Sequence, residues 1–386
     1  MNQSVLIARQ IAQGRGPDAV VVERVASAET ARLGSGGVAA AREALASDVL
    51  GLGPLEPCLA DPTVTDVLVN GDGSIWVDRG RGLQEWPTRL PDPAAARRLA
   101  VRLAGLAGRR LDESQPWVDG VLPVGVRLHA VLPPLVDGGA HLSLRVPRVR
   151  APGLSALGAG GMFSGQVERL LRALVLRRCS FVVTGGTGSG KTTLLAAMLA
   201  EVPPSERIVV VEDVRELAVQ HPHVVRLQGR GPNVEGRGAV TLVDLVRQAL
   251  RMRPDRLVVG EVRGAEVREM LAALNTGHEG GCGTVHANTP ADLPARFEAL
   301  GALAGLGREA VHAQLASAVQ AAVHVERGTA GRGTAGRLVG SLSVLVRGDP
   351  GNTAVRCVSA LDARTGERGP GWSALAGLLE EAQCWP

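Results

Sequence analysis

The only lysine of the 386-residue chain, Lys191, lies within the octet GGTGSGKT at residues 185–192. The other 41 of the 42 basic side chains are arginines, so position 191 requires an ammonium group that a planar guanidinium does not replace. The octet fits the pattern G-x-x-x-x-G-K-[ST], in which backbone N–H groups surround phosphates and the lysine reaches the β- and γ-phosphates. The predicted phosphate-binding residues are Gly185, Gly186, Thr187, Gly188, Ser189, Gly190, Lys191, Thr192 and Thr193.

The residues on either side of the octet support this interpretation. CSFVVT (179–184) is typical of a short buried strand, and TTLLAAMLAEV (192–202) is typical of a helix with an apolar face. The helix N-terminus adds partial positive charge at the phosphates, and the Thr192 hydroxyl can bind Mg²⁺. The alternative is a glycine-rich turn that contains a lysine by chance. Such a turn would not explain the strand predicted before it and the helix predicted after it. We therefore expect the chain to bind ATP with Mg²⁺.

Composition narrows the class of protein. The length allows two or three domains, and cores of Val, Leu and Ala are expected because aromatic residues make up only 2%. Five widely spaced cysteines without a C-x-x-C pair predict neither a disulfide framework nor a zinc ribbon, and favour a reducing cytoplasm. No apolar stretch approaches about 18 residues, so any role at the membrane would come through a partner. The net charge of +4, with both signs interspersed, argues against a dedicated nucleic-acid surface.

The chain divides into four expected regions. Residues 1–44 form a helical or loose segment, and residues 45–146 an α+β domain with a hairpin at 65–78, a helix near 93–107 and strands around 125–133 and 141–146. The Pro/Gly/Ser-rich segment 147–165 is the expected linker. In residues 166–386 strands alternate with helices, which predicts a mostly parallel sheet with ligands at the carboxyl ends of its strands. The tandem repeat GTAGRGTAGR (328–337) is expected at the tip of a hairpin.

Carboxylates stand at the ends of two predicted strands in this last region. RIVVVED (207–213) ends with Glu212 and Asp213, and RLVVGE (256–261) ends with Glu261. A triphosphate site needs one carboxylate near Mg²⁺ and often a second to orient the attacking water. A single glutamate at a strand end is usually a solvated cap, but two in one such domain favour a catalytic role.

A loop at TGHEGGCGTVHAN (276–288) carries His278, Cys282 and His286. These types can bind a metal, but only three are present, and the intervening glycines disfavour a helix that would present them together. Two interpretations therefore remain in place of a metal site: a loop that senses the γ-phosphate, or simple buried histidines.

Taken together, these motifs resemble those of the type II/type IV secretion ATPase superfamily, most closely its CpaF/TadA-like tight-adherence (Flp) pilus branch. The resemblance rests on GLGPLEPCLADPTVTDVLVNG (51–71), VEDVREL (211–217), LRMRPDRLVVGEVRGAE (250–266) and TGHEGGCGTVHANTP (276–290). One departure from general P-loop proteins is Gly260, where a Walker B strand would carry aspartate. The four-cysteine metal module of some type II members is absent.

The resemblance implies a fold and roles for named residues. The fold class is α/β, a RecA-like P-loop NTPase domain with a smaller α+β N-terminal domain. Glu212 would polarise the attacking water, Glu261 would support the metal together with Thr192, and His286 would sense the γ-phosphate. Arg127 and Arg145 of the N-terminal domain would lie near a nucleotide.

The expected function is that of a homohexameric ATPase at the inner face of the cytoplasmic membrane. It would power pilus assembly or protein secretion through integral inner-membrane platform proteins. A type IV secretion or conjugation ATPase that moves DNA or protein is the main alternative. A P-loop small-molecule kinase is a further alternative, although it would need an acceptor pocket and a lid.

Overall fold

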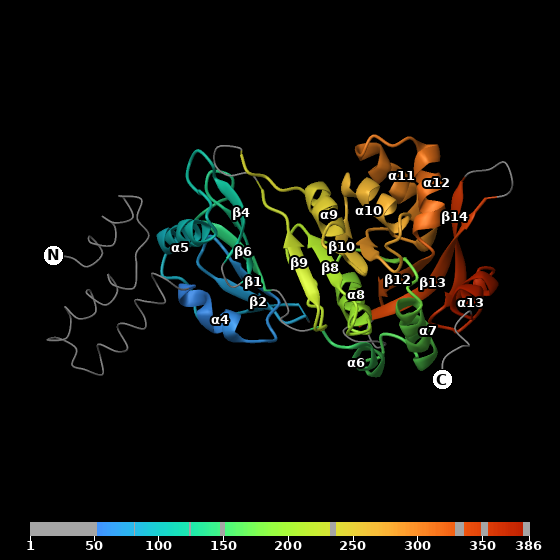
Figure 1. Ribbon diagram of the computed structural model, residues 1–386. Coiled ribbons are helices and arrows are strands. Elements are labelled where there is room, and N and C mark those ends of the chain that lie inside the picture. Colours follow the sequence, from blue (N-terminus) through green and yellow to red (C-terminus); the bar gives the residue numbers. More distant parts are fainter. Residues whose placement is uncertain are drawn as a thin grey trace, which may run out of the picture. The chain divides into compact units, whose positions relative to one another are not determined.

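The computed structural model divides the chain into two units, residues 1–147 and 148–386 (Figure 1). The structure describes residues 52–80, 82–122, 125–146, 151–231, 237–328, 336–348 and 354–380. The N-terminal segment expected over residues 1–44 therefore lies outside the described residues, as do residues 329–335 of the tandem repeat.

The first unit is built on a six-stranded antiparallel sheet with the strand order β3-β2-β1-β6-β5-β4. Alternate residues of β1 and β2 are buried, as expected for strands with one face on a core, and the predicted hairpin is confirmed. β3 and β4 were not predicted, because β3 is exposed throughout and β4 contains a glycine. The strands are β1 (Asp66–Val69), β2 (Ile75–Asp78), β3 (Leu83–Glu85), β4 (Trp117–Val121), β5 (Arg127–Val131) and β6 (His141–Arg145).

One long helix, α5 (Pro93–Leu106), packs on β5 and β6 of this sheet. It begins where Asp92 accepts a hydrogen bond from the Ala95 N–H and where Pro93 occupies the first turn. Its buried leucines and alanines join Leu128 and Leu142 in a separate core. A short 3₁₀ turn (Gly53–Leu55) and α4 (Glu56–Ala60) precede β1.

The second unit contains an eight-stranded sheet with the order β14-β13-β12-β7-β11-β10-β8-β9. Strands β12 through β9 in that order run parallel, whereas β13 and β14 are antiparallel additions at one edge. The predicted mostly parallel sheet is therefore confirmed. The strands are β7 (Phe181–Thr184), β8 (Ile208–Glu212), β9 (Val224–Gln228), β10 (Arg256–Val262), β11 (Cys282–Val285), β12 (Ala321–Arg327), β13 (Arg337–Arg347) and β14 (Val355–Asp362).

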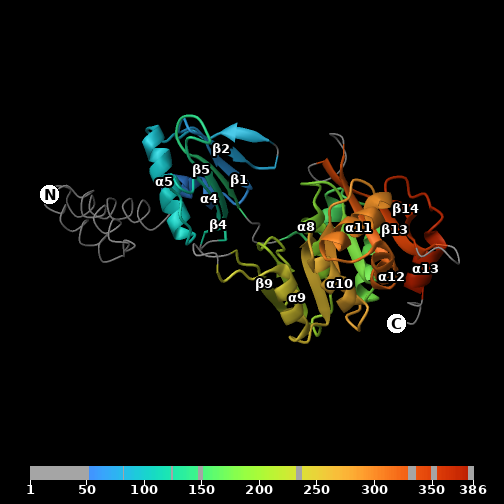
Figure 2. The same ribbon diagram turned by 90° about the horizontal axis from the view of Figure 1, so that it is seen from above.

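Helices cover both faces of this sheet (Figures 1 and 2). Side-chain alternation explains the two layers, because Val183 and Val210 face one core while Val182 and Val209 face the other. The first core includes residues of α6 (Leu154–Ala159), α7 (Gly165–Leu176), α8 (Lys191–Leu199) and α13 (Trp372–Glu380). The second includes residues of α9 (Leu242–Leu250), α10 (Glu266–Leu274), α11 (Leu293–Leu303) and α12 (Arg308–Ala318).

The structure differs from the linker expected over residues 147–165. Leu154 and Leu157 lie in α6 and are buried in the first core of the second unit, as are Met162 and Phe163. Glycines at 158, 160 and 161 break the apolar periodicity, so the short helix gives no sequence pattern of its own. Ser164 then caps α7 by accepting a hydrogen bond from the Val167 N–H.

None of the described helices combines the length and apolar composition needed to cross a membrane.

The burial of α6 predicts a stability effect. Leu154→Ala removes a side chain with no exposed surface, so we expect the free energy of unfolding of the second unit to fall by about 2–5 kcal/mol. Leu176→Ala, at the 51% exposed end of α7, is the control and should cost less than about 1 kcal/mol. Urea titration followed by circular dichroism measures both changes. Equal small losses would mean that α6 is a spacer rather than part of the core.

Candidate functional site

Residues 185–190 form the turn between β7 and α8 at the carboxyl edge of the parallel sheet. Gly188 and Gly190 have φ angles of +69° and +103°, which side chains other than glycine rarely adopt. At Gly185 an added Cβ would lie 2.0 Å from the Val325 carbonyl oxygen, so glycine is also required for close packing. Because α8 begins at Lys191, its first N–H groups point into the turn, which makes this a site suited to anions.

Lys191 lies inside this turn with only 7% of its surface exposed. Its Nζ donates hydrogen bonds to the carbonyl oxygens of Gly185 and Gly186, at 2.9 and 2.8 Å. Burial lowers the pKa of the ammonium, and the nearby Glu261 carboxylate acts in the opposite direction. The loop thus holds a partly desolvated cation at the edge of the sheet, where a phosphate can reach it.

Glu212 ends β8 and is 4% exposed. Its Oε1 accepts hydrogen bonds from the Glu216 and Leu217 N–H groups, at 3.0 and 2.9 Å. Its Oε2 is buried and has no hydrogen-bond partner among the described residues. Burial raises the pKa of this carboxyl group, against the lowering effect of the two backbone hydrogen bonds. A carboxylate of this kind is suited to accept a proton or to orient water.

Gly260 leaves the space that Glu212 fills. An added Cβ at residue 260 would lie 2.5 Å from the Glu212 Cγ. β8 and β10 are parallel neighbours, with Val211 opposite Val259, so the two positions meet across the ladder. Gly260 leaves Glu261 without an adjacent acid in the sequence. In the structure, Glu212 of β8 lies beside position 260 and supplies a carboxylate there instead.

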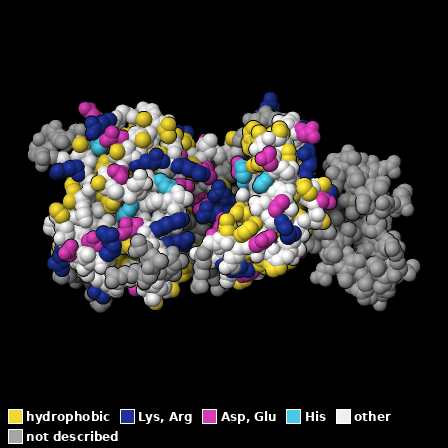
Figure 3. All heavy atoms as spheres, turned by 180° about the vertical axis from the view of Figure 1, so that it is seen from behind, with side chains coloured by type: hydrophobic (Ala, Val, Ile, Leu, Met, Phe, Trp, Pro, Cys, Tyr) yellow, Lys and Arg dark blue, Asp and Glu magenta, His cyan; other side chains and the backbone are white. Residues whose placement is uncertain are grey.

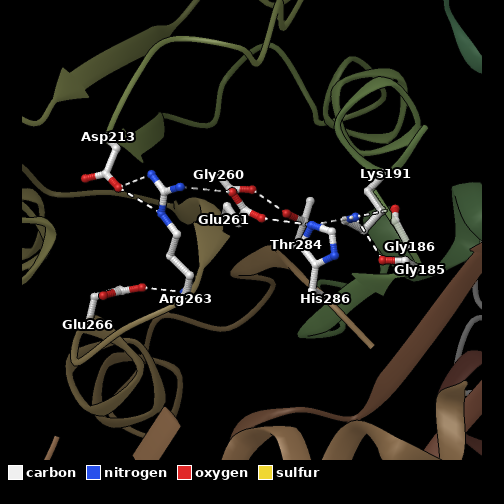
Figure 4. Close-up of polar contacts among 10 residues, drawn as sticks. All are labelled: Gly185, Gly186, Lys191, Asp213, Gly260, Glu261, Arg263, Glu266, Thr284 and His286. Atoms are coloured by element: carbon white, nitrogen blue, oxygen red, sulfur yellow. Dashed lines mark hydrogen bonds and ion pairs between the residues drawn. The ribbon is translucent and has the colours of Figure 1, made fainter. Parts of the chain in front are cut away.

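Glu261, His286 and Lys191 form a chain of contacts along the edge of the sheet (Figure 4). The His286 Nε2 lies 3.2 Å from the Glu261 Oε1 and 3.3 Å from the Lys191 Nζ. Burial lowers the pKa of His286 and Lys191 lowers it further, whereas Glu261 raises it. A neutral imidazole can accept from the ammonium or, as the other tautomer, donate to the carboxylate.

The strand order explains how residues far apart in sequence come together. β7, β11, β10 and β8 are adjacent in that order, and they lead to Lys191, His286, Glu261 and Glu212 respectively. Carboxyl ends of parallel strands share one edge of a sheet. The structure therefore brings all four of these predicted residues to one edge of the second unit.

Arg263 extends the chain of contacts; in the sequence it is one of seven arginines crowded in this region, most of which are expected to be solvated or ion-paired. Its guanidinium makes an ion pair with Asp213, and its Nη1 lies 3.7 Å from the Glu261 Oε2 (Figure 4). Its backbone N–H donates to the Glu266 Oε1 at 2.6 Å, which fixes the turn into α10. The only sequence signal for this role is its position two residues after Glu261. Many other arginines nearby in the sequence obscure that signal.

A buried pair supports the start of the turn and was also missed. Thr184, the last residue of β7, has its Oγ1 2.9 Å from the Nδ1 of His324 on β12. The two residues are opposite each other in the parallel ladder. Burial lowers the pKa of His324. A lone histidine within an apolar strand carries no sequence signal for this contact.

His278 and Cys282 do not join His286. Cys282 is buried in β11, where burial raises the pKa of its thiol to about 12, and the His278 Nδ1 lies 3.3 Å from the Ala273 carbonyl oxygen. Within the described residues, no group of three or more His, Cys, Asp or Glu side chains is arranged to hold a metal ion.

The residues present fit the oxygen ligands that Mg²⁺ prefers. Thr192 lies half-buried in the first turn of α8, and the Glu261 carboxylate is partly exposed at the adjacent edge. With phosphate oxygens and water, a hydroxyl and a carboxylate form the kind of ligand set that Mg²⁺ uses at nucleotide sites.

Arg127 and Arg145 belong to the first unit. They are directly opposite each other on β5 and β6, and the Arg145 side chain is exposed. Their neighbours Leu128 and Leu144 point to the core, so the two arginines share the other face of that sheet.

Comparison with known proteins provides a family and relatives. The family model described as "Type II/IV secretion system protein" matches residues 48–329. A putative conjugal transfer protein of Mycobacterium tuberculosis is 58% identical over 306 residues, which cover 78% of this chain and 87% of the relative. Conjugal transfer protein TrbB of Rhizobium radiobacter is 33% identical over 279 residues, which cover 71% and 83%.

The X-ray structure of the Legionella pneumophila ATPase DotB is similar in fold. It is 19% identical, with a TM-score of 0.55, and the match covers 84% of this chain and 90% of that one. Together with the sheet topology, this confirms the predicted fold class, a RecA-like P-loop domain with a smaller α+β N-terminal domain.

The fit between Gly260 and Glu212 predicts the effect of a single methyl group. Gly260→Ala would place a Cβ against Glu212 and displace its carboxylate, so ATP hydrolysis should fall by about 100-fold or more while ATP binding is retained. Gly377→Ala is the matched control, because a Cβ there meets nothing within 4 Å. Steady-state hydrolysis and nucleotide titration measure the two properties. Normal turnover in Gly260→Ala would contradict the assigned fit.

Acidification should destabilise the second unit through His324. Its folded pKa is lowered, so below the unfolded value of about 6.5 the unfolded chain takes up a proton that the folded chain does not. The free energy of unfolding therefore falls as the pH drops from about 7 towards 5. His324→Gln removes this titration and should give a shallower loss, measured by urea titration across that range. An identical slope in the variant would contradict the role of His324.

Proposed function

Because the chain belongs to the type II/IV secretion system protein family and is an ATPase, we propose that it is the motor of a pilus-assembly or protein-secretion machine. The observation that carries this proposal is the row of Lys191, His286, Glu261 and Glu212 along one sheet edge. These side chains supply a phosphate-binding cation and two carboxylates, groups that phosphoryl transfer to water uses, with an imidazole between the cation and one carboxylate.

Each residue has a role in the proposed reaction. Lys191 and the N–H groups of residues 186–193 hold the phosphates, which would replace the Gly185 and Gly186 carbonyl oxygens as partners of the ammonium. Glu212 orients the attacking water and accepts its proton, because its buried carboxyl group has a raised pKa. Mg²⁺, held by Thr192 and supported by Glu261, would neutralise charge on the phosphates.

His286 would report the γ-phosphate to the rest of the sheet edge. Its Nε2 contacts both Lys191 and Glu261, so a phosphate that draws the ammonium away leaves the imidazole to Glu261 alone. Arg263 connects Glu261 onward to Asp213. The loss of γ-phosphate would thus change contacts along a row of side chains rather than at one atom.

We extend the proposal to a homohexameric ring at the inner face of the cytoplasmic membrane, working on integral platform proteins. Arg127 and Arg145 form a pair of cross-strand cations, and in the assembled ring they would supply positive charge to the transferring phosphate. The motif at residues 51–71 favours the tight-adherence pilus branch.

Conjugal transfer is the second candidate, because the relatives from Mycobacterium tuberculosis and Rhizobium radiobacter carry that name. The chain contains eight Trp and Phe residues and no Tyr, which leaves few platforms for stacking bases. On the face shown in Figure 3, acidic side chains lie among the arginines. For this reason we keep a pilus or protein-secretion role as the first candidate.

Assembly and cargo class can be tested together. If neighbouring subunits complete the site, the hydrolysis rate per subunit should rise steeply with protein concentration, and the protein with ATP should elute as a hexamer. Arg127→Ala should lower turnover by about 100-fold or more with a smaller effect on ATP affinity. Arg89→Ala, which breaks an exposed ion pair with Asp72 in the same unit, is the control.

Two results would redirect this assignment. A monomer with full specific activity would contradict the ring. Strong stimulation of hydrolysis by single-stranded DNA would favour the conjugation motor over a pilus or protein-secretion motor.

A further inference from the structure

Strand β12 continues beyond the end of its neighbour β7. His324 is opposite Thr184, the last residue of β7, yet β12 runs on to Arg327. Three further residues at about 3.3 Å each extend it by roughly 10 Å past the point where β7 turns into the phosphate-binding loop. The hairpin of β12 and β13, in which Arg327 is opposite Arg337, therefore runs alongside this loop.

Contacts at three glycines show that the hairpin packs against the loop. The Val325 carbonyl oxygen lies 2.0 Å from the position of an added Cβ on Gly185. The Arg327 Nη2 lies 2.4 Å from the corresponding position on Gly188, and the Arg337 Cδ lies 3.2 Å from that on Gly190. The guanidinium of Arg327 thus takes the place that a side chain at residue 188 would occupy.

The carboxylate next to Arg327 in the sequence pairs with another arginine. Glu326, the adjacent carboxylate, is paired instead with Arg364, at 3.3 Å. Among the residues that the structure describes, Arg327 makes no ion pair, and its side chain is exposed. A guanidinium held against an anion-binding loop without a carboxylate partner is placed to bind phosphate, often through two N–H groups.

We propose that Arg327 binds the phosphate chain of ATP within its own subunit, from the side of the loop opposite the sheet-edge carboxylates. The proposal rests on the nucleotide site proposed above, to which it adds a ligand from outside the octet. It also means that the β12–β13 hairpin contacts the nucleotide directly. The alternative is a structural role, in which Arg327 only packs over Gly188 and supports the turn.

Substitution of Arg327 tests this proposal with ATP itself as the probe. The full-length Arg327→Ala variant should bind ATP about tenfold or more weakly, as expected for the loss of a charge-assisted hydrogen bond, and Arg327→Lys should recover part of the affinity. Arg347→Ala is the matched control, because this exposed arginine stands at the other end of β13 and donates to the Ser317 Oγ. Isothermal titration gives the affinities, and the midpoint of thermal unfolding without nucleotide reports the stability of the turn.

The possible outcomes separate the alternatives. Weaker ATP binding by Arg327→Ala, with an unchanged unfolding midpoint and a normal Arg347→Ala control, would support a phosphate contact. Unchanged ATP affinity would overturn it. A loss of affinity accompanied by a lower unfolding midpoint, and not recovered by lysine, would also overturn it in favour of the supporting role. If the unmodified protein bound no ATP, the nucleotide site itself would be refuted.

Discussion

The arrangement of the second unit depends on one buried ammonium group, that of Lys191. Burying an isolated charge costs several kcal/mol, which is comparable to the whole free energy of unfolding of a domain. The Lys191 ammonium therefore needs favourable interactions with the groups around it. Two loop carbonyl oxygens supply part of it, and the Glu261 carboxylate supplies a further favourable interaction. Glu261 can do this only because β7, β11 and β10 are parallel neighbours whose ends meet at one edge. The burial of Lys191 therefore depends on this order of the strands in the sheet.

Much of this arrangement was predictable because local sequence determines it. The octet requires a strand before it and a helix after it, and β7 and α8 follow that pattern. Thr241 and Asp244 form the capping box that begins α9, which is a local signal as well. Glu212 and Glu261 could be located because each ends an apolar run, and parallel strands place such ends together.

Other features depend on contacts between distant residues, and no local pattern reports them. The need for glycine at 260 comes from Glu212, 48 residues earlier in the chain and on a neighbouring strand. Thr184 meets His324 from 140 residues away. The helix α6 was missed because glycines obscure its period, although Leu154 and Leu157 are core residues. Sequence therefore identified the chemical groups of the site, whereas the packing that positions them emerged only in three dimensions.

The solitary, buried lysine also bears on the chemistry of the whole surface. Every other basic side chain is an arginine, so no lysine amine is available on the exterior to reagents or enzymes that acylate or conjugate amines. Among the side chains of this sequence, Lys191 is the only primary amine that such modification can reach. A bound nucleotide would shield Lys191, so the loss of labelling at this residue would be a direct footprint of occupancy.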